Sequence, residues 1–330
     1  MSKEAILRLL VETDDYVSGE GMSEALGVSR AAIWKSIRAL REAGYEIEAR
    51  TNRGYRLLVS PDTPLPEAIR PLCASEDLCR EIIYLDAVDS TNTYLKREAA
   101  SGAPHGTVAI AGEQTGGRGR MGRPFISHSG KGLFFSILLR PEAVLPASIT
   151  SLTAFAAVAV CEAIEAVAPI KPKVKWVNDI LVGDRKLVGI LSEMSMLGES
   201  GQVDYVVIGV GVNVHYQAED FPEEIRDRAT SLAILTDTPQ SRAKLAAALI
   251  DAFSRMYKVC QTEPETYVDR YRARSATVGR EILVLRGEES LPALATGIAP
   301  DCGLIVRYPD GGEETLFYGE TSIRTERGYV

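Results

Sequence analysis

The chemistry that this sequence can support is clearest in a glycine-rich segment with two arginines, Gly116–Gly122, which reads GGRGRMG. Glycine lets backbone amides approach a ligand closely, and the guanidinium groups of Arg118 and Arg120 can bind a carboxylate or phosphate through paired hydrogen bonds. The segment therefore predicts a mobile loop that binds an anionic ligand. Taken alone, it could also be a solvated turn with two surface arginines.

The glycine spacing in this loop also matches the GxGxxG turn of dinucleotide-binding proteins, through Gly117, Gly119 and Gly122. That turn must open a helix whose N-terminus binds the pyrophosphate. Here the glycines are followed by Pro124 and then by an apolar run, 133–139, that is typical of a strand. The context therefore argues against a nicotinamide dinucleotide site.

A second group of polar residues lies around a predicted β-hairpin. The sequence KWVND at 175–179 is followed by an apolar run, a Gly183–Asp184 turn and a second run at 186–193. Lys175 and Lys186 could then serve one site. Plain surface charge is the alternative explanation for these lysines.

A third motif, GVGVN at 209–213, ends a predicted buried strand with glycines and an amide. Glycines are expected in a strand where a ligand or another backbone lies close against it. Gly209 and Gly211 therefore predict a strand surface that a ligand can reach, and Asn213 adds a polar group at its end. Close packing within the protein would also explain the glycines.

The elements that must position these groups form a central mixed α/β domain. Between about Ile82 and Tyr271, strand-like and helix-like runs alternate along the chain. The strand-like runs are 108–112, 133–139, 174–177 and 203–212, and the helix-like runs are 91–100, 151–168 and 242–259. From Ser275 onward, short runs between Gly, Pro and Asp residues predict a small β-barrel, at 282–285, 294–298, 304–308, 316–318 and 322–324.

The N-terminal region has the pattern of a winged helix-turn-helix. Two apolar helical segments, 3–12 and 22–26, precede a third helix that Ser29 can cap. Apolar residues of that third helix, Ile33, Ile37 and Leu40, line one face. Alternating residues on both sides of a turn at 52–54 then predict a β-hairpin wing.

Charge distinguishes this region from the rest of the chain. The net charge of −8 argues against a protein that binds nucleic acid with its whole surface, yet 30–56 contains seven arginines and lysines against three glutamates. We therefore expect DNA contacts from the third helix, through Arg30, Lys35 and Arg38, and from the wing, through Arg53. A small helical module for protein interaction is the alternative.

Chain composition and the positions of prolines predict how the chain divides into domains. A chain of 330 residues with 45% hydrophobic and 25% charged residues is long and apolar enough for about two globular domains. Prolines 61, 64, 66 and 71 mark a linker, because proline disfavours helix interiors and central strands. The predicted divisions are 1–60 for the DNA-binding domain, 61–80 for the linker, 81–272 for the central domain and 273–330 for the C-terminal domain.

Cysteine and histidine usage and the lack of targeting signals point to a protein of the cytoplasm. The five cysteines and three histidines lack the spacing of zinc ligands, so we expect reduced thiols and no zinc site. These residues are Cys73, Cys79, Cys161, Cys260, Cys302, His105, His128 and His215. The N-terminus has no signal-peptide pattern, and no uncharged apolar stretch reaches spanning length, so we expect no membrane association.

In combination, these motifs resemble the family of bifunctional biotin protein ligases and biotin operon repressors, over essentially the whole chain. The matching segments are DSTN at 89–92, Gln114 with GGRGRMG, KWVND, the run 185–191, GVGVN, and Gly319–Glu320 followed by Arg324. The resemblance implies a winged helix-turn-helix, a central catalytic domain similar to class II aminoacyl-tRNA synthetases, and a C-terminal SH3-like barrel.

The resemblance also implies what the protein does. It implies synthesis of biotinyl-adenylate from biotin and ATP with Mg²⁺, followed by transfer of biotin to a lysine of a biotin carboxyl carrier protein. It further implies repression of biotin genes at operator DNA by a homodimer that ligand binding promotes. Attack of a carboxylate on the α-phosphate brings two anions together, and Arg118, Arg120, Lys186 and magnesium can supply the positive charge that this step needs.

Site residues follow from the same resemblance. The biotin-binding residues are expected to be Ser90, Thr91, Asn92, Gln114, Arg118, Gly119, Arg120, Lys186 and Gly189. The residues for ATP and the adenylate are expected to be Arg120, Lys175, Asn178, Asp179, Asn213 and Arg324. Among these, Lys186, Arg118 and Asp179 are expected to serve the reaction, with Asp179 near the magnesium ion.

Three positions depart from the family pattern, and three other functions compete. Met121 stands where a second arginine is common, Val177 where proline is usual, and Phe125 where a tryptophan often packs on the lid. The nearest competing enzyme is a lipoate ligase or octanoyltransferase of the same fold. The others are a transcriptional regulator that only senses the ligand, and a ligase whose N-terminal domain does not bind DNA.

Overall fold

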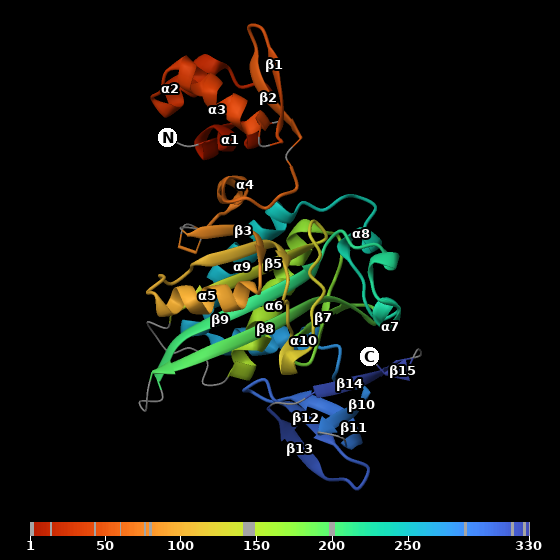
Figure 1. Cartoon of the computed structure of the whole chain (residues 1–330). Coiled ribbons are helices and arrows are strands. Elements are labelled where there is room, and N and C mark those ends of the chain that lie inside the picture. The colour runs from red at the N-terminus through yellow and green to blue at the C-terminus, as the bar shows by residue number, and fades with distance from the viewer. Residues whose placement is uncertain are drawn as a thin grey trace. The chain divides into compact units, whose positions relative to one another are not determined.

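The computed structural model of the chain contains two compact units (Figure 1). Unit 1 comprises Met1–Ala74 and Ser241–Ala247, and unit 2 comprises Ser75–Gln240 and Ala248–Val330. The structure describes residues 3–13, 15–42, 44–59, 61–75, 77–78, 81–140, 149–197, 202–286, 289–317, 320–325 and 328–329. Cys79 and Gly319, which the sequence analysis names, lie outside these ranges.

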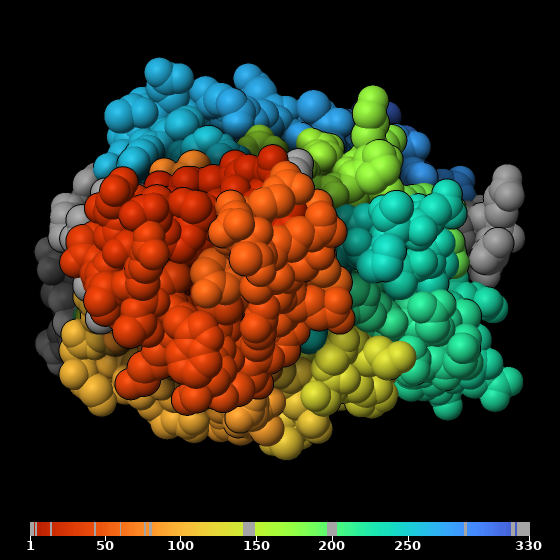
Figure 2. All heavy atoms as spheres, turned by 90° about the horizontal axis from the view of Figure 1, so that it is seen from above, coloured from red at the N-terminus to blue at the C-terminus, as the bar shows by residue number. Residues whose placement is uncertain are grey.

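The N-terminal part of unit 1, up to Val59, has three helices and a β-hairpin wing, as the sequence predicts. Its elements are α1 (Lys3–Val11), α2 (Gly19–Leu26), α3 (Arg30–Glu42), β1 (Glu46–Arg50) and β2 (Gly54–Val59). Buried apolar residues from all three helices, such as Leu7, Met22 and Ile37, form the core. In the space-filling view of Figure 2, the red and orange atoms of this unit are closely packed.

Capping residues define the turn between α2 and α3. Ser18 caps α2 by accepting a hydrogen bond from the amide of Gly21, and Gly27 ends this helix in the left-handed conformation at φ 63°. The hydroxyl of Ser29 accepts a hydrogen bond of 3.3 Å from the amide of Ala32 at the start of α3, as predicted. The side chains therefore fix the tight turn that a helix-turn-helix requires.

The proline-rich stretch that follows contains short helices rather than extended chain alone. Helix α4 (Pro66–Ile69) and the 3₁₀ helix η1 (Arg70–Leu72) each have a proline in the first turn. Proline is tolerated there because the first amides of a helix have no partner within the helix. The predicted boundaries of the linker and of the domains stay predictions.

Unit 2 is built on a seven-stranded mixed sheet with the order β3-β4-β5-β9-β8-β7-β6. The strands are β3 (Ile82–Val88), β4 (Val108–Gln114), β5 (Gly132–Leu139), β6 (Lys173–Lys175), β7 (Asp179–Val182), β8 (Arg185–Leu197) and β9 (Gln202–Asn213). Strands β3 and β4 are parallel, and the other neighbours are antiparallel. The predicted mixed α/β domain and its hairpin are confirmed.

Helices cover both faces of this sheet (Figure 1). They are α5 (Thr91–Ala100), α6 (Ile149–Val167), α9 (Arg242–Thr262), of which residues 248–262 belong to unit 2, and α10 (Pro264–Arg274). The short helices η2 (Arg120–Gly122), η4 (Ala218–Asp220), α7 (Glu223–Arg226) and α8 (Leu232–Leu235) lie in connecting segments. On β5, Leu138 packs in a cluster with Leu95 of α5, whereas Phe135 stacks on Phe253 of α9. Residues 135 and 138 point to opposite faces of a strand, so α5 and α9 lie on opposite sides.

Helix α6 is a core helix. By length and composition alone it could cross a membrane, but 78% of its most apolar window is buried inside the protein. Phe155 on this helix packs against Tyr267 of α10 with ring centroids 5.5 Å apart. Its apolar composition is therefore explained by packing within unit 2.

The C-terminal part of unit 2 is a small antiparallel sheet of the SH3-like kind. Its strands are β10 (Glu281–Arg286), β11 (Glu289–Ile298), β12 (Leu304–Arg307), β13 (Glu313–Leu316), β14 (Glu320–Thr325) and β15 (Gly328–Tyr329), in the order β13-β12-β11-β10-β14-β15. Trp176 connects this part to the end of β6, because its amide donates to Thr277 Oγ1 at 2.9 Å and its indole to the Cys302 carbonyl at 3.0 Å.

Candidate functional site

Unit 2 contains a cavity of about 380 Å³ above strands β5, β9 and β8. Nearly all predicted residues for biotin and the adenylate line it: Ser90, Thr91, Asn92, Gln114, Arg118, Gly119, Arg120, Lys175, Asn178, Asp179, Lys186, Gly189 and Asn213. The exception is Arg324, which lies on β14 and whose side chain is outside the described part of the chain. Segments more than a hundred residues apart are thus brought to one place.

The floor of the cavity is made of glycines because other groups fill the space above them. Gly209 and Gly211 of β9 lie opposite Ser136 and Phe134 of β5. A Cβ atom on Gly209 would lie 2.2 Å from Asn92 Oδ1, and one on Gly211 would lie 2.5 Å from the ring of Phe125. The glycines of the GVGVN motif therefore let Asn92 and Phe125 lie against the backbone, which fits the alternative of close packing within the protein. Contact between this strand and a ligand stays a prediction.

The N-terminus of α5 supplies buried polar groups to one end of the cavity. Thr91 donates from its amide and its hydroxyl to Gln114 Oε1, at 2.9 and 3.2 Å. Ser136 donates from its single hydroxyl toward Thr91 Oγ1 or Asn92 Oδ1, each at 2.7 Å. Ser90, Thr91 and Asn92 are 5%, 4% and 3% exposed. A helix N-terminus with buried hydroxyls and amides is suited to a small polar ligand such as a ureido or carbonyl group.

Glu193 fixes these groups from below, and sequence reasoning missed it. Its carboxylate accepts hydrogen bonds from Asn92 Nδ2 at 2.9 Å and from Lys96 Nζ at 2.7 Å. Burial raises the pKa of Glu193, but the hydrogen bonds from Lys96 and Asn92 outweigh burial and leave this pKa below its usual range. The carboxylate is therefore ionised at neutral pH and holds Asn92 in a fixed orientation.

The glycine-arginine loop folds over the cavity as a lid segment, residues 116–125. It turns back on itself, since the amide of Phe125 donates to the Gly117 carbonyl at 2.9 Å and the amide of Gly119 to the Arg123 carbonyl at 2.7 Å. The segment leads through η2 into β5 and opens no long helix, which agrees with the argument against a dinucleotide turn.

The two arginines of the lid segment contact different sides of the cavity. Arg118 donates to Thr93 Oγ1 on α5 at 3.1 Å, and Arg120 donates to Asn178 Oδ1 beside β7 at 3.3 Å. Met121 is 79% exposed at the tip of the segment and has a positive φ of 54°. Phe125, by contrast, turns inward onto the glycines of the floor. The departure at 121 therefore lies at the surface, and the departure at 125 lies inside the cavity.

Lys186 and Asp179 form an ion pair at the other end of the cavity, with Nζ and Oδ1 2.6 Å apart. The backbone of Lys186 is held on both sides, because its amide donates to the Arg228 carbonyl at 2.7 Å and its carbonyl accepts from the Thr230 amide at 2.9 Å. Asn213 donates to the Thr230 carbonyl at 3.0 Å. Lys186 and Asn213 are thus both hydrogen-bonded to the backbone of residues 228–230, a segment that the sequence motifs did not include.

Asp179 is the only acidic side chain among the described residues that line the cavity. Magnesium is typically bound by one or two carboxylates together with phosphate oxygens and waters, so this donor set fits an ion that arrives with ATP. The structure thus contains a residue suited to the predicted metal and no complete metal cage among its described residues.

Several further residues that line the cavity gave no signal in the sequence. From the segment between β9 and α9 come Phe221, Ile225, Arg228 and Ala229. Thr321 comes from β14, and its buried hydroxyl has no hydrogen-bond partner among the described residues. No motif marks these positions. The parallel bridge between Lys186 and Ala229 and the hydrogen bond from Asn213 to the Thr230 carbonyl bring the first segment to the site, and such pairing cannot be predicted from residue spacing.

The predicted DNA-binding residues are exposed on unit 1. Arg30, Lys35 and Arg38 lie on α3, and Arg53 lies in the turn of the wing. Arg30 pairs with Glu20 at 2.7 Å, and Arg38 lies over the ring of Trp34, 5.1 Å from its centroid. Trp34 was missed by sequence reasoning although it is 55% exposed, which is unusual for a tryptophan outside an interaction surface.

Comparison with known proteins gives two family matches and close relatives. Residues 84–213 match the Biotin/lipoate A/B protein ligase family, and residues 3–56 match an HTH domain. The chain is 41% identical over 245 residues to the bifunctional ligase/repressor BirA of Bacillus subtilis, which is 74% of either chain. It is 30% identical over 321 residues to the bifunctional ligase/repressor BirA of Escherichia coli, covering 96% of this chain and 95% of the relative.

A solved structure agrees with the sequence matches. The biotin protein ligase of Aquifex aeolicus in complex with biotin and ATP superposes with a TM-score of 0.64 at 29% identity, covering 75% of this chain and 100% of that one.

Proposed function

The chain belongs to the family of bifunctional biotin ligases and transcriptional repressors, and on this basis we propose that it activates biotin with ATP, transfers it to a carrier protein and represses transcription. The observation that carries the ligase activity is that Lys186, Arg118 and Arg120 line the same cavity as the buried polar end of α5. The acceptor is a lysine of a biotin carboxyl carrier protein.

The two ends of the cavity suit the two parts of the substrate. We assign the polar head of biotin to Ser90, Thr91, Asn92 and Gln114, because their buried groups can donate and accept hydrogen bonds. The biotin carboxylate then points toward Lys186. One carboxylate oxygen attacks the α-phosphorus of ATP, the bond to pyrophosphate breaks, and biotinyl-adenylate forms.

Positive charge at the α-phosphate is the main requirement of this step. The ammonium of Lys186 and the guanidinium of Arg120 stabilise the negative charge that develops on the phosphate oxygens. We place magnesium at Asp179, where it would neutralise the phosphates of ATP. Binding of ATP and magnesium would break the ion pair between Lys186 and Asp179. The free-energy cost of breaking it is low because the substrate becomes the new partner of Lys186 and the metal that of Asp179.

The lid segment protects the product. Biotinyl-adenylate is an activated acyl group, so water must be excluded until the carrier lysine arrives. Arg118 and Arg120 connect the segment to α5 and to Asn178, and with these contacts it can close on the ligand. The lysine amine then attacks the acyl carbon, the bond to AMP breaks, and the amine loses its proton as the amide forms.

The ligase assignment is tested by one incubation series. The purified protein, ATP, Mg²⁺ and a carrier domain are combined with labelled biotin or labelled lipoate, and the carrier label and pyrophosphate are measured. We expect biotin to label the carrier and lipoate to fail. Equal labelling by lipoate would favour an acyltransferase of the same fold, and absence of pyrophosphate release would reduce the central domain to a ligand sensor.

Repression is assigned to unit 1. We infer that α3 lies in the major groove and that the wing follows the sugar-phosphate backbone, as in other winged helix-turn-helix domains. Because one such domain contacts few base pairs, we expect a homodimer on paired half-sites, promoted by the adenylate. These events take place in the cytoplasm, where ATP, carrier protein and operator DNA are available.

The repressor assignment is tested with the full-length chain. Binding to a fragment upstream of the organism's own biotin genes is compared with binding to a random duplex, with and without biotin plus ATP. We expect adenylate to strengthen binding to the biotin-gene fragment, and Arg38→Ala to weaken it by about tenfold to a hundredfold, the usual range for one base contact. If the protein binds both duplexes with the same affinity, it is a ligase whose N-terminal domain is not a specific DNA-binding repressor.

A further inference from the structure

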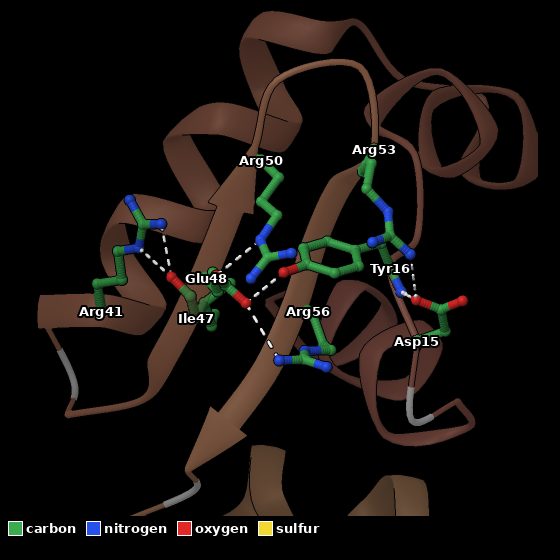
Figure 3. Close-up of polar contacts among 8 residues, drawn as sticks. All are labelled: Asp15, Tyr16, Arg41, Ile47, Glu48, Arg50, Arg53 and Arg56. Atoms are coloured by element: carbon green, nitrogen blue, oxygen red, sulfur yellow. Dashed lines mark hydrogen bonds and ion pairs between the residues drawn. The ribbon is translucent and has the colours of Figure 1, made fainter.

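The outer face of the wing contains an aromatic ring surrounded by three arginines. Tyr16, in the connection between α1 and α2, lies beneath the guanidinium groups of Arg50, Arg53 and Arg56, which are 5.2, 4.5 and 5.1 Å from the ring centroid (Figure 3). A cation within about 6 Å of a ring face is attracted by the ring. One tyrosine therefore gathers cations from β1, from the turn and from β2.

A carboxylate completes this arrangement. The hydroxyl of Tyr16 donates a hydrogen bond to Glu48, which also accepts from Arg50 Nε at 2.9 Å and from Arg56 Nη2 at 3.2 Å (Figure 3). The hydrogen bond from Tyr16 holds the pKa of Glu48 below its usual range, and burial together with Glu48 raises the pKa of Tyr16. At neutral pH, Tyr16 is therefore a neutral donor and Glu48 an ionised acceptor.

The backbone fixes Tyr16 against the wing. Val17 forms an antiparallel bridge with Tyr55, with hydrogen bonds of 2.8 and 2.9 Å in the two directions. Gly54 makes this approach possible, because a Cβ at that position would lie 2.1 Å from the Val17 carbonyl. From the other side, Arg41 of α3 donates to the Ile47 carbonyl at 3.0 and 2.6 Å (Figure 3). Both α3 and the α1–α2 connection therefore brace the hairpin.

The charges of this cluster are arranged for an external anion. Three arginines face two carboxylates, since Asp15 pairs with Arg53 at 3.1 Å, so that one positive charge is in excess. The side chains of Arg50, Arg53 and Arg56 are 53%, 52% and 35% exposed. Three exposed guanidinium groups that come from both strands and the turn and gather around one ring can contact neighbouring phosphates of a polymer.

We propose that Tyr16 is a positioning residue that holds Arg50, Arg53 and Arg56 as a phosphate-binding surface for duplex DNA. This inference rests on the proposed repressor function, and it states which residues of the wing bind the DNA phosphates. Mutual repulsion and side-chain flexibility would otherwise spread the three arginines. The ring of Tyr16 and the carboxylate of Glu48 order them before DNA arrives, which lowers the entropy lost on binding.

The test compares two substitutions of similar size in the full-length chain, Tyr16→Phe and Tyr16→Leu. Phenylalanine keeps the ring face and loses the hydroxyl, whereas leucine keeps apolar bulk and loses both. Binding to a 40-base-pair duplex of random sequence and to a duplex selected by the parent from a random pool is measured across salt concentrations. Thermal midpoints and adenylate synthesis report whether each variant is folded.

We expect Tyr16→Leu to bind both duplexes about tenfold more weakly than the parent. The slope of log K against log salt should shrink by about 0.9 for each phosphate that the variant no longer binds. The weakening should be the same factor for both duplexes because phosphate contacts carry no sequence information. Tyr16→Phe should stay within about threefold of the parent with an unchanged slope, since the ring face remains.

Two further measurements separate positioning from a general structural effect. In a background of Arg50→Ala, Arg53→Ala and Arg56→Ala, Tyr16→Leu should cause no additional weakening, because there is nothing left to position. Arg8→Ala is the control for removal of an exposed arginine on α1 and should change the slope less than any wing arginine. If Tyr16→Leu binds like the parent with the same slope, the positioning role is overturned while DNA binding stands. If the parent binds neither duplex, the repressor function and this inference fail together.

Discussion

The cavity of unit 2 and the wing of unit 1 both place cations beside carboxylates, but they enclose these groups to different degrees. In the cavity, Lys186 and Asp179 lie 2.6 Å apart with side chains 37% and 21% exposed. In the wing, Arg53 and Asp15 lie 3.1 Å apart with side chains 52% and 72% exposed. The clearest difference is between the carboxylates, and the more enclosed Asp179 is screened less by salt than Asp15.

The two regions also differ in what holds the cations. Lys186 lies on a strand whose backbone is hydrogen-bonded to the segment around Arg228, so its position is fixed by the sheet. The wing arginines are held by side chains instead, namely the ring of Tyr16 and the carboxylates of Glu48 and Asp15. A fixed site can distinguish one small anion from another, and an adaptable surface can follow the backbone of a long polymer.

Salt should therefore separate the two activities, and this is the largest effect that we expect. Raising monovalent salt from about 50 to 200 mM should weaken DNA binding by roughly 10³-fold if a dimer contacts about six phosphates. Adenylate synthesis should change by less than about threefold, because binding of small ligands in the cavity does not release a row of condensed counterions from a polymer. Fluorescence anisotropy and pyrophosphate release measure the two responses on one preparation. Parallel losses would mean that the cavity is as exposed to ions as the wing.

Lys186→Ala should be the most damaging single change in the cavity. Removing one charged group at a developing oxyanion costs about 10² to 10³ in rate, so adenylate formation in a single turnover should fall by that factor. DNA binding without ligand should be unchanged. Lys258→Ala is the matched control, because this lysine forms an exposed ion pair with Asp77 at 2.8 Å in the same unit. A loss below tenfold in Lys186→Ala would remove the lysine from the reaction.

The sequence predicted the cavity well because its residues come in short motifs. The Gly183–Asp184 turn placed Lys186 on a hairpin, and that hairpin is formed by β7 and β8. The glycine-arginine loop predicted the lid segment for the same reason. Local turn chemistry and residue spacing are sufficient when the functional groups lie within a few residues of the turn.

Contacts between distant segments could not be predicted in this way. Glu193 binds Asn92 and Lys96, which lie 101 and 97 residues away. Tyr16 and Glu48 are 32 residues apart and meet because Gly54 lets the α1–α2 connection approach the wing. Such pairs depend on strand order and on which side chain fills a gap, and neither is encoded in periodicity.

Gly209→Ala tests the close packing of the cavity floor. The added Cβ would lie 2.2 Å from Asn92 Oδ1, and Asn92 is buried and held by hydrogen bonds, so the strand or the asparagine must move. Overpacking of this kind costs about 1 to 3 kcal/mol, and we expect a lower thermal midpoint together with a higher KM for biotin. Gly297→Ala is the control, since its Cβ would meet Ile305 at 3.5 Å, an ordinary contact. If the two variants have the same thermal midpoint and the same KM for biotin, Gly209 is not closely packed against Asn92.

The smallest effect that we expect concerns Glu20 of α2, whose carboxylate competes with DNA phosphates for Arg30 at the start of α3. Glu20 lies 2.7 Å from Arg30, and both side chains are 68% exposed. An exposed ion pair contributes little to stability, so Glu20→Gln should leave the thermal midpoint unchanged and free Arg30 for a phosphate. Removing this competitor should strengthen DNA binding by about twofold to fivefold at low salt, as expected for a pair of this kind.

A remote charge change separates this local effect from a change in net charge. Glu265→Gln removes one exposed acid from α10 in unit 2 and should leave DNA affinity unchanged. If both variants strengthen binding equally, the effect belongs to the overall charge of −8 rather than to Arg30. If Glu20→Gln instead weakens binding, Glu20 holds Arg30 in place for DNA as Glu48 holds the wing arginines. In that case, α3 and the wing would share one principle, in which a surface carboxylate orders an arginine before the phosphate replaces it.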